Sequence, residues 1–132
     1  MKRYLLDTHC FLWSLFEPEK LGSQAVSILE NLDNSIYIST VSFWEISLKY
    51  ETGKLVLTCP PDKLIVMAEK MGLKTIPLSV EEAALFYKLP KSEHKDPFDR
   101  MLIWQAILHK FILISKDSKF ENYRQFGLKT VW

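Results

Sequence analysis

The sequence predicts an α/β fold in which a parallel sheet lies between two layers of helices. Short apolar segments typical of buried strands alternate along the chain with longer segments that have the apolar pattern of helices. A strand that leads through a helix into the next strand forms a crossover connection, and such connections build parallel sheets with helices on both faces. No linker, repeat or low-complexity segment interrupts the 132 residues, so we expect a single domain over residues 1–132.

Five segments have the composition of strands. The first is a short apolar run that ends in Asp7, and the second follows the turn sequence Asp33-Asn34-Ser35. The third contains Pro77, which cannot donate a hydrogen bond to a neighbouring strand, so we expect this strand at an edge of the sheet. The expected strands are residues 3–6, 36–39, 75–78, 111–114 and 128–131.

The first half of the chain predicts three helices. Residues 8–16 are apolar and aromatic and stop before a proline, while residues 23–32 place their apolar side chains on one face. Ser42 and Glu45 fit the S-x-x-E pattern of a capping box. We therefore expect a third helix to begin at Ser42 and to run to Gly53.

The second half contains a helix with an unusually clear start. It follows an amphipathic helix over residues 62–71 and a helix capped by Ser79. Asp96 is a favoured N-cap, and Pro97 is a favoured first helical residue. Asp99 lies in the first turn, where the helix dipole favours a negative charge. The residues behind it are apolar nearly all round, so we expect this helix in the interior.

The composition excludes several classes of protein. With 48% hydrophobic and 25% charged residues the chain is typical of a globular protein, and its net charge of +1 means that a nucleic acid would have to be bound by a local patch. Cys10 and Cys59 are isolated, which favours reduced thiols in a cytoplasmic protein. No apolar segment approaches the ~20 residues of a membrane span, and we find no signal peptide. With four glycines, neither a P-loop nor a G-x-G-x-x-G motif is present, which argues against nucleotide cofactors.

Four acids lie where a parallel α/β sheet forms its binding sites, beyond the carboxyl ends of the strands. Asp7 follows the first strand, Glu45 lies one helical turn past the second, Asp117 follows the fourth, and Asp99 begins the helix before that strand. Each could simply cap a helix, but Ser, Thr or Asn caps as well as Asp does. Several carboxylates together repel one another unless a cation lies among them, and hard oxygen ligands favour Mg²⁺ or Mn²⁺.

The segments that carry these acids resemble the motifs of PIN-domain ribonucleases, and most closely those of VapC-type toxins from bacterial toxin–antitoxin pairs. The likeness extends from the first strand to the last, and the H-x-D-P-F-D-R run is its most specific part. The matching segments are Leu5-Leu6-Asp7-Thr8-His9, Val41-Ser42-Phe43-Trp44-Glu45-Ile46-Ser47, His94-Lys95-Asp96-Pro97-Phe98-Asp99-Arg100 and Ile114-Ser115-Lys116-Asp117. The resemblance implies a PIN-like three-layer α/β/α fold with a five-stranded parallel sheet, and Mg²⁺-dependent endoribonuclease activity that leaves a 5′-phosphate and a 3′-hydroxyl.

The resemblance also assigns roles to individual residues. The family's four acidic positions, which are both catalytic and metal-binding, correspond to Asp7, Glu45, Asp99 and Asp117. Asp96 is an additional acid, which either ligates the metal or only caps the helix. Ser115 occupies a common Ser/Thr position. Weaker substrate-binding candidates beside the acids are Ser115, Arg100, Lys116 and His94.

The partners that the resemblance implies are an RNA substrate, a cognate antitoxin and a second copy of the chain, with no membrane. The aromatic side chains that we expect in the core, from their helical spacing, are Phe11, Trp13, Phe43, Trp44, Phe98 and Trp104. An exposed Trp13 or Phe16 would instead indicate a dimer or antitoxin surface. Two alternatives remain. One is a catalytically inactive PIN-like module that binds RNA or protein. The other is an Asp-dependent phosphatase with Asp7 as nucleophile, which fits poorly because such enzymes carry a second acid at the position of His9. A receiver-like signalling module lacks its acidic pair here.

Overall fold

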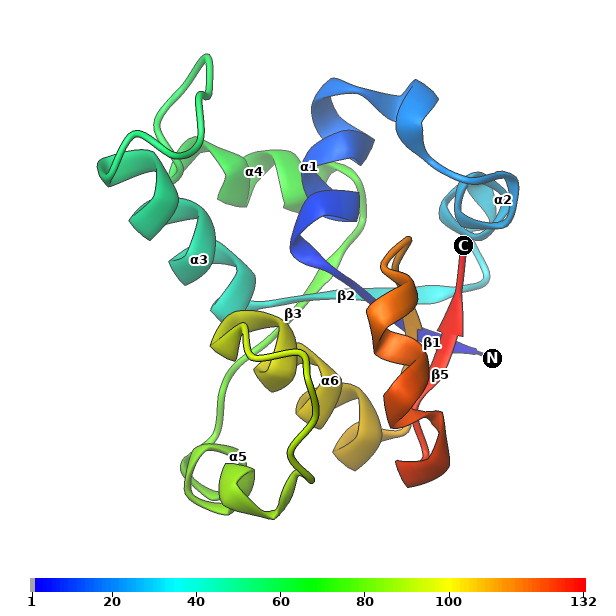
Figure 1. Cartoon of the computed structure of the whole chain (residues 1–132). Coiled ribbons are helices and arrows are strands. Elements are labelled where there is room, and N and C mark those ends of the chain that lie inside the picture. The colour runs from blue at the N-terminus through cyan, green and yellow to red at the C-terminus, as the bar shows by residue number, and fades with distance from the viewer. Residues whose placement is uncertain (1) are drawn as a thin grey trace.

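A computed structural model describes residues 2–132 of the chain and contains one five-stranded sheet. The order is β3-β2-β1-β4-β5, and every neighbouring pair is parallel (Figure 1). The strands are β1 (Arg3–Leu6), β2 (Ser35–Ser39), β3 (Lys74–Ile76), β4 (Ile112–Ile114) and β5 (Lys129–Val131). The predicted fold class is confirmed. The third strand is an edge strand, as expected, and it ends directly before Pro77.

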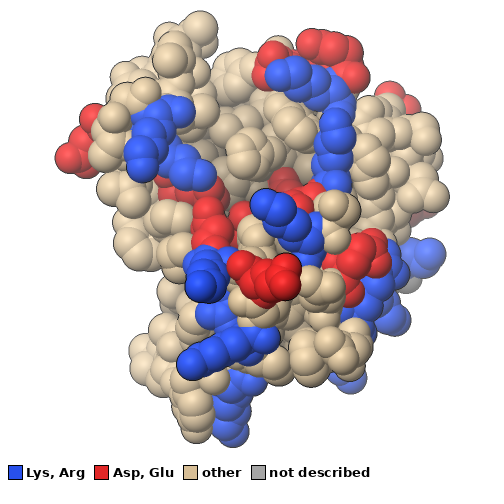
Figure 2. All heavy atoms as spheres, in the orientation of Figure 1, with Lys and Arg blue, Asp and Glu red and all other residues tan. Residues whose placement is uncertain are grey.

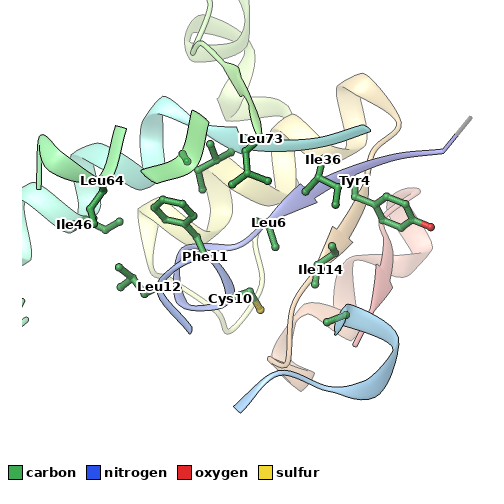
Figure 3. Packing of buried hydrophobic residues seen from close by; sticks show 13 residues of the cluster. Tyr4, Leu6, Cys10, Phe11, Leu12, Ile36, Ile46, Leu64, Leu73 and Ile114 are labelled. Atoms are coloured by element: carbon green, nitrogen blue, oxygen red, sulfur yellow. The ribbon is translucent and has the colours of Figure 1, made fainter. Parts of the chain in front are cut away.

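The central strand β1 separates two apolar clusters, one on each face of the sheet. Tyr4 and Leu6 pack in the cluster that α1, α2 and α4 cover, part of which is drawn in Figure 3. Leu5 points to the opposite face and packs in the cluster that α6 and η3 cover. This alternation follows from the two-residue period of a strand. Because both faces of β1 are buried, the residue that follows it is held firmly at the centre of the sheet's carboxyl edge.

Helices connect and cover the strands. The α-helices are α1 (Thr8–Phe16), α2 (Ser23–Glu30), α3 (Thr40–Glu51), α4 (Lys63–Lys70), α5 (Val80–Leu85) and α6 (Pro97–His109). Three short 3₁₀ segments complete them, namely η1 (Pro18–Lys20), η2 (Phe86–Lys88) and η3 (Ser118–Phe126). Within residues 2–132, none of these helices is long and apolar enough to cross a membrane.

The expected capping box at Ser42 and Glu45 is wrong. Helix α3 begins at Thr40, and its N-cap is Ser39, the last residue of β2, whose Oγ accepts a hydrogen bond from the backbone N–H of Val41 at 3.1 Å. Ser42 lies inside the helix, where its Oγ accepts a hydrogen bond from the hydroxyl of Thr8 at 2.9 Å. The helix starts earlier because the chain turns directly from the strand. The side chain of Glu45 is therefore free of any capping role.

Trp44 is a second correction, since its side chain is 61% exposed rather than part of the core. It lies on the outer face of α3, edge-on to Phe98 with 5.0 Å between the ring centroids. Leu48, one turn further along the same face, is also exposed. Helical spacing alone placed Trp44 inside, whereas the buried face of α3 is formed by Val41, Ser42, Glu45 and Ile46.

A buried polar network joins α5 to α6. Glu82 caps α5 in a true capping box with Ser79, and its carboxylate also accepts a hydrogen bond from Nε2 of Gln105 at 3.0 Å. Nε2 of His109 contacts the other carboxylate oxygen of Glu82. Gln105 in turn accepts a hydrogen bond from the hydroxyl of Ser39 at 2.6 Å. This network joins α5 to the C-terminal half of α6, at the end of the helix opposite Asp99.

Candidate active site

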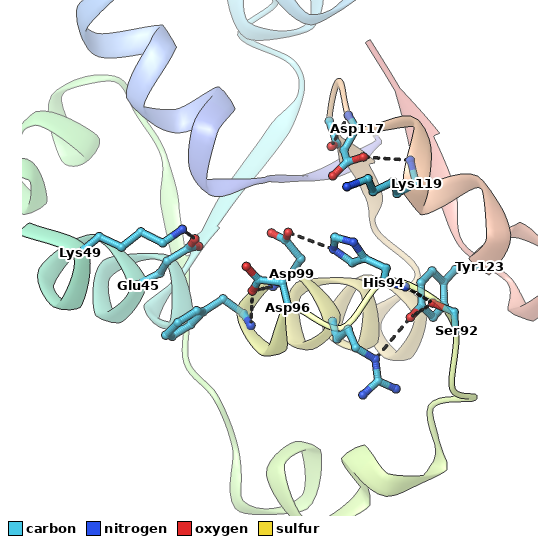
Figure 4. Close-up of polar contacts among 12 residues, drawn as sticks. Glu45, Lys49, Ser92, His94, Asp96, Asp99, Asp117, Lys119 and Tyr123 are labelled. Carbon is cyan, nitrogen blue, oxygen red and sulfur yellow. Dashed lines mark hydrogen bonds and ion pairs between the residues drawn. The ribbon is translucent and has the colours of Figure 1, made fainter. Parts of the chain in front are cut away.

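The four predicted acids gather at the carboxyl edge of the sheet. Asp7 directly follows β1, Asp117 follows β4 after a short loop, and Asp99 lies in the first turn of α6. In Figure 4, Asp99 lies between Glu45 of α3 on one side and Asp117 on the other. Acidic and basic side chains are mixed over the middle of this face of the molecule, which Figure 2 shows in the orientation of Figure 1.

Asp7 is buried and serves as the N-cap of α1. Its Oδ1 accepts a hydrogen bond from the backbone N–H of Cys10 at 2.8 Å, and the side chain of Ser115 also hydrogen-bonds to it. Burial raises the pKa of Asp7, and these hydrogen bonds offset only part of that effect. The position at the end of the central strand thus holds a carboxylate whose charge is poorly compensated by the protein alone.

Asp96 and Asp99 have different surroundings although they share one motif. Oδ1 of Asp96 accepts hydrogen bonds from the backbone N–H groups of Phe98 at 2.9 Å and of Asp99 at 3.2 Å, as a helix N-cap does. Oδ2 of Asp99 lies 3.0 Å from Nε2 of His94. Burial, together with the negative charges of Asp96 and Glu45, raises the pKa of Asp99 to about 6, although His94 acts in the opposite direction.

Asp117 completes a compact group with His94 and Asp99. One possible ligand atom from each of the three side chains lies within 4.8 Å of the others. Asp117 also caps η3, where its Oδ1 accepts a hydrogen bond from the backbone N–H of Lys119 at 2.9 Å. The backbone N–H of Asp117 donates to Oγ of Ser115 at 3.1 Å, so Ser115 positions both Asp117 and Asp7.

Glu45 lies on the other side of Asp99 and is almost completely buried, with 2% of its surface exposed. Its Oε2 accepts a hydrogen bond from Nζ of Lys49 at 2.5 Å. Within residues 2–132, its Oε1 has no hydrogen-bond partner. A buried carboxylate oxygen without a partner is costly. Glu45 is thus an acid with one oxygen paired and one oxygen available to a ligand.

Two adjoining pockets open onto the acids, and both are lined by Asp99 and Asp117. The smaller, of about 290 Å³, is lined by Asp7, His9, Trp13, Asp99, Lys116, Asp117 and Phe120. The larger, of about 610 Å³, is lined by Glu93, His94, Lys95, Asp96, Asp99, Asp117, Lys119 and Asn122. Asp7, Asp99 and Asp117 can therefore act on one bound molecule, with lysines at the rim to contact its anionic groups.

Arg100 lies outside these pockets. Its guanidinium donates hydrogen bonds to the backbone carbonyls of Leu89 and Pro90 and to the hydroxyl of Tyr123, and it lies 4.9 Å from the ring centroid of Phe86. These contacts hold the loop before α6 in place. Of the other weak candidates, Lys116 lines the smaller pocket and His94 lines the larger one.

Sequence reasoning did not single out Lys49, although its spacing offered a signal. Lys49 follows Glu45 by four residues, a separation at which helical side chains meet and an acid–base pair is favoured. Sequence reasoning also left His94 out of the metal-binding set, because the order of residues does not show that its ring contacts Asp99. The loop before α6 and the helix α3 converge at this edge, which brings His94 and Lys49 to the same group of acids.

The donor set fits a hard divalent cation. Asp7, Glu45, Asp99 and Asp117 offer carboxylate oxygens, the ligands that Mg²⁺ and Mn²⁺ prefer. Oε1 of Glu45 is buried without a partner among the described residues, and the pKa of Asp99 is raised by burial and by the negative charges of Asp96 and Glu45, which a cation would balance. The first observation concerns Oε1 of Glu45 and the second the carboxyl of Asp99. A cation bound between these two side chains would satisfy both.

A five-stranded parallel sheet with acids at its carboxyl edge defines the class of protein. A profile of the PIN domain matches residues 4–125, and the chain belongs to the PIN-domain family. More narrowly, the chain is of the VapC type. Ribonuclease VapC22 from Mycobacterium tuberculosis is 30% identical over 133 residues, which cover all of both proteins. The resemblance inferred from the acid-bearing motifs is thereby confirmed.

Solved structures show the same fold. VapBC2 from Rickettsia felis, determined with a DNA fragment from its promoter, contains a chain that aligns with a TM-score of 0.71 and 18% identity, over 98% of each chain. DNA-bound VapBC from Salmonella typhimurium aligns with a TM-score of 0.66 and 16% identity, over 99% of this chain and 98% of that one. VapBC-1 from Haemophilus influenzae aligns with a TM-score of 0.62 and 17% identity, over 98% of this chain and 96% of that one.

Proposed function

We propose that this protein is a Mg²⁺-dependent endoribonuclease and the toxin of a type II toxin–antitoxin pair. The observation that carries the proposal is the convergence of Asp7, Asp99 and Asp117 on one pocket, in a chain that is similar over its whole length to a ribonuclease. Glu45 supports it from the other side of Asp99, through the unpartnered oxygen described above. Asp96 supports the helix as its cap and is not assigned as a ligand.

The four acids Asp7, Glu45, Asp99 and Asp117 would hold the cation. When bound, a divalent ion lowers the pKa of a water molecule to be used in attack and neutralises charge on the phosphoryl oxygens. His94 orients the carboxylate of Asp99, and Ser115 orients those of Asp7 and Asp117. The lysines at the pocket rims, Lys95, Lys116 and Lys119, bind phosphates on either side of the cleaved bond.

The reaction is hydrolysis of a phosphodiester. The oxygen of water forms a bond to phosphorus, the bond from phosphorus to the 3′-oxygen breaks, and that oxygen takes up a proton. The products are a 5′-phosphate and a 3′-hydroxyl. Water is the only co-reactant, and the reaction requires neither an oxidant nor a nucleotide. An RNA substrate is consistent with our proposal that the protein acts in the cytoplasm.

The test is cleavage of RNA by the purified full chain. We expect degradation with millimolar Mg²⁺ or Mn²⁺, none with EDTA, and recovery when Mg²⁺ is added back. The Asp99→Asn protein, purified identically, controls for contaminating nuclease. Cleavage that persists in EDTA, or an Asp99→Asn protein as active as the wild type, would contradict the proposal. Release of phosphate from phosphomonoesters without RNA cleavage would favour the phosphatase alternative.

We further propose that an antitoxin binds the apolar pocket beside the acids. This pocket, of about 330 Å³, is lined by His9, Leu12, Trp13, Phe16, Glu17, Leu55, Val56, Leu57 and Thr58. Phe16 is partly exposed and Val56 is 90% exposed, an arrangement that favours a protein partner. The three solved VapBC structures, which are toxin–antitoxin systems, support such a partner.

The first step in testing the antitoxin surface is to look for a small reading frame directly upstream and to purify its product. We expect the two proteins to co-purify, and Val56→Asp to weaken the complex by at least about tenfold, because a charge in an apolar interface is desolvated without a partner. Val80→Asp is the matched control, since Val80 is 86% exposed on α5 and does not line this pocket. Equal binding by both variants would place the antitoxin elsewhere.

The third proposed partner is a second copy of this chain. Trp44 and Leu48 form an exposed apolar strip on α3, at the separation that places side chains on one helical face. We propose that this strip forms the homodimer interface. Sedimentation equilibrium should show a dimer for the wild type and a monomer for Trp44→Asp, with Tyr87→Asp on η2 as the control. A dimer unaffected by Trp44→Asp would locate the interface on another surface.

A further inference from the structure

Lys49 and Glu45 form a partly buried ion pair at the acidic site. Glu45 has 2% of its side chain exposed and Lys49 has 32%. The ammonium contacts only Oε2 of the carboxylate, across one turn of α3. A carboxylate buried to this extent is strongly unfavourable without a charged partner. Lys49 supplies that partner in the protein by itself.

The ammonium of Lys49 also lies in the field of the other acids. Besides the hydrogen-bonded carboxylate of Glu45, the carboxylates of Asp96 and Asp99 act on this ammonium electrostatically. In Figure 4 the Lys49 side chain runs along α3 and ends beside the carboxylate of Glu45, and Asp99 is the next acid of the site. Its positive charge therefore belongs to the acidic site as a whole.

The two oxygens of Glu45 have separate tasks in this arrangement. Oε2 is held by Lys49, whereas Oε1 is buried and has no partner within the described chain, residues 2–132. A cation bound between Glu45 and Asp99 can use Oε1 without displacing Lys49. A second cation on Oε2 would have to replace the ammonium.

We propose that Lys49 is a fixed cation of the active site, which occupies one oxygen of Glu45 and limits the acidic cluster to a single divalent ion. This inference rests on the proposed metal-dependent function and adds the number of ions to it. Lys49 is a positioning residue, because it acts on the substrate only through Glu45 and through the charge of the site.

The experiment measures Mn²⁺ binding to the metal-free full chain without RNA, by electron paramagnetic resonance of the free ion. We expect one Mn²⁺ for the wild type. Lys49→Gln keeps a hydrogen-bond donor but removes the charge, so it should bind a second Mn²⁺ or bind the first at least about tenfold more tightly. Lys49→Arg retains the charge and should match the wild type. Lys70→Gln, an exposed lysine at the end of α4, controls for the change in net charge.

A structural role for Lys49 alone would not tighten metal binding. If metal-free Lys49→Gln is unfolded, we expect Mn²⁺ to refold it, since a divalent ion restores the missing positive charge. Unchanged or weaker Mn²⁺ binding by Lys49→Gln, or failure of Mn²⁺ to refold it, would overturn the inference while the metal site of the wild type stands. A wild-type protein that binds no Mn²⁺ would overturn both this inference and the proposed metal dependence.

Discussion

The backbone N–H of Asp99 donates a hydrogen bond to Oδ1 of Asp96 at 3.2 Å. The two acids of the motif are therefore unequal, since Asp96 uses an oxygen on the helix terminus while both oxygens of Asp99 are free of the backbone cap. One of them, Oδ2, contacts His94, and the Asp99 side chain lines both pockets. Asp96 also lines the larger pocket, but only Asp99 of the two lines the smaller pocket that holds Asp7.

The first prediction compares these two acids. Asp99→Asn should lower the RNA cleavage rate by roughly 1000-fold or more, because loss of a ligand charge removes several kcal/mol of transition-state stabilisation. Asp96→Asn should retain most activity and stability, because Asn is about as good an N-cap as Asp. Asp96→Ala should cost about 1 kcal/mol of unfolding free energy. Cleavage rates at saturating Mg²⁺ and urea melts of the three variants check this. An Asp96→Asn protein as inactive as Asp99→Asn would make Asp96 a metal ligand.

The second prediction concerns Asp7. Asp7→Asn should abolish cleavage and leave the fold as stable as before or slightly more stable. Asn still accepts the hydrogen bond from Cys10 as N-cap, and the substitution removes a charge whose ionisation burial opposes. The measurements are cleavage rate and thermal melting in EDTA. Asp62→Asn, before the exposed start of α4, is the matched control. Normal cleavage by a folded Asp7→Asn protein would exclude Asp7 from the site.

The third prediction is a pH dependence of the metal-free protein. The pKa of Asp99 is raised from 3.8 to about 6 on folding. Between about pH 4 and about pH 6 the unfolded chain releases this proton while the folded protein keeps it, so the contribution of Asp99 to stability falls as the pH rises. Above about pH 6, the ionised Asp99 lowers the free energy of unfolding by a constant amount of up to about 3 kcal/mol.

Asp99→Asn should remove this dependence. In EDTA, the unfolding free energy of Asp99→Asn minus that of the wild type should increase from pH 4 to pH 7. Urea melts at several pH values measure it, with Asp33→Asn at an exposed turn as the control for loss of one charge. A difference that is constant with pH would show that the carboxyl of Asp99 ionises as it does in the unfolded chain.

The fourth prediction concerns the network between α5 and α6. Burial alone would raise the pKa of Glu82, but hydrogen bonds with His109, Gln105 and the backbone N–H of Ser79 lower it from 4.5. The stability that this carboxylate contributes is therefore present above about pH 4.5 and is lost as the pH falls through the folded pKa.

Glu82→Gln should lower the unfolding free energy at pH 7 by about 1.5–3 kcal/mol, the range for hydrogen bonds to charged groups. The cost should shrink at a pH below the folded pKa, where the wild-type carboxyl is protonated as well. Urea melts at both pH values measure the effect. RNA cleavage by the folded variant should be unchanged, because Glu82 lines neither pocket at the acids. An equal loss of stability at both pH values would mean that packing, rather than charge, accounts for the network.

Local pattern predicted the order of strands and helices along the chain and the cap of α6. A short apolar run between turn residues is typical of a buried strand, and the sequence Asp96-Pro97 favours a helix start. Because parallel strands align their carboxyl ends, the positions of Asp7, Asp99 and Asp117 in the chain already predicted that they would meet. That meeting is visible in the pocket that all three line.

Tertiary structure alone decided which partner each side chain meets. The start of α3 depended on where β2 ends, so Ser39 rather than Ser42 became the cap. Arg100 is held by the carbonyls of Leu89 and Pro90, which only the folded loop brings near it. The burial of Glu45 beside Lys49 depends likewise on packing across α3 and α6. By itself the sequence determined the fold, through local periodicity, and the acidic residues, through their places after the strands and at the start of α6. The charge balance of the site was decided by long-range packing, because the partners and burial of each side chain come from distant segments.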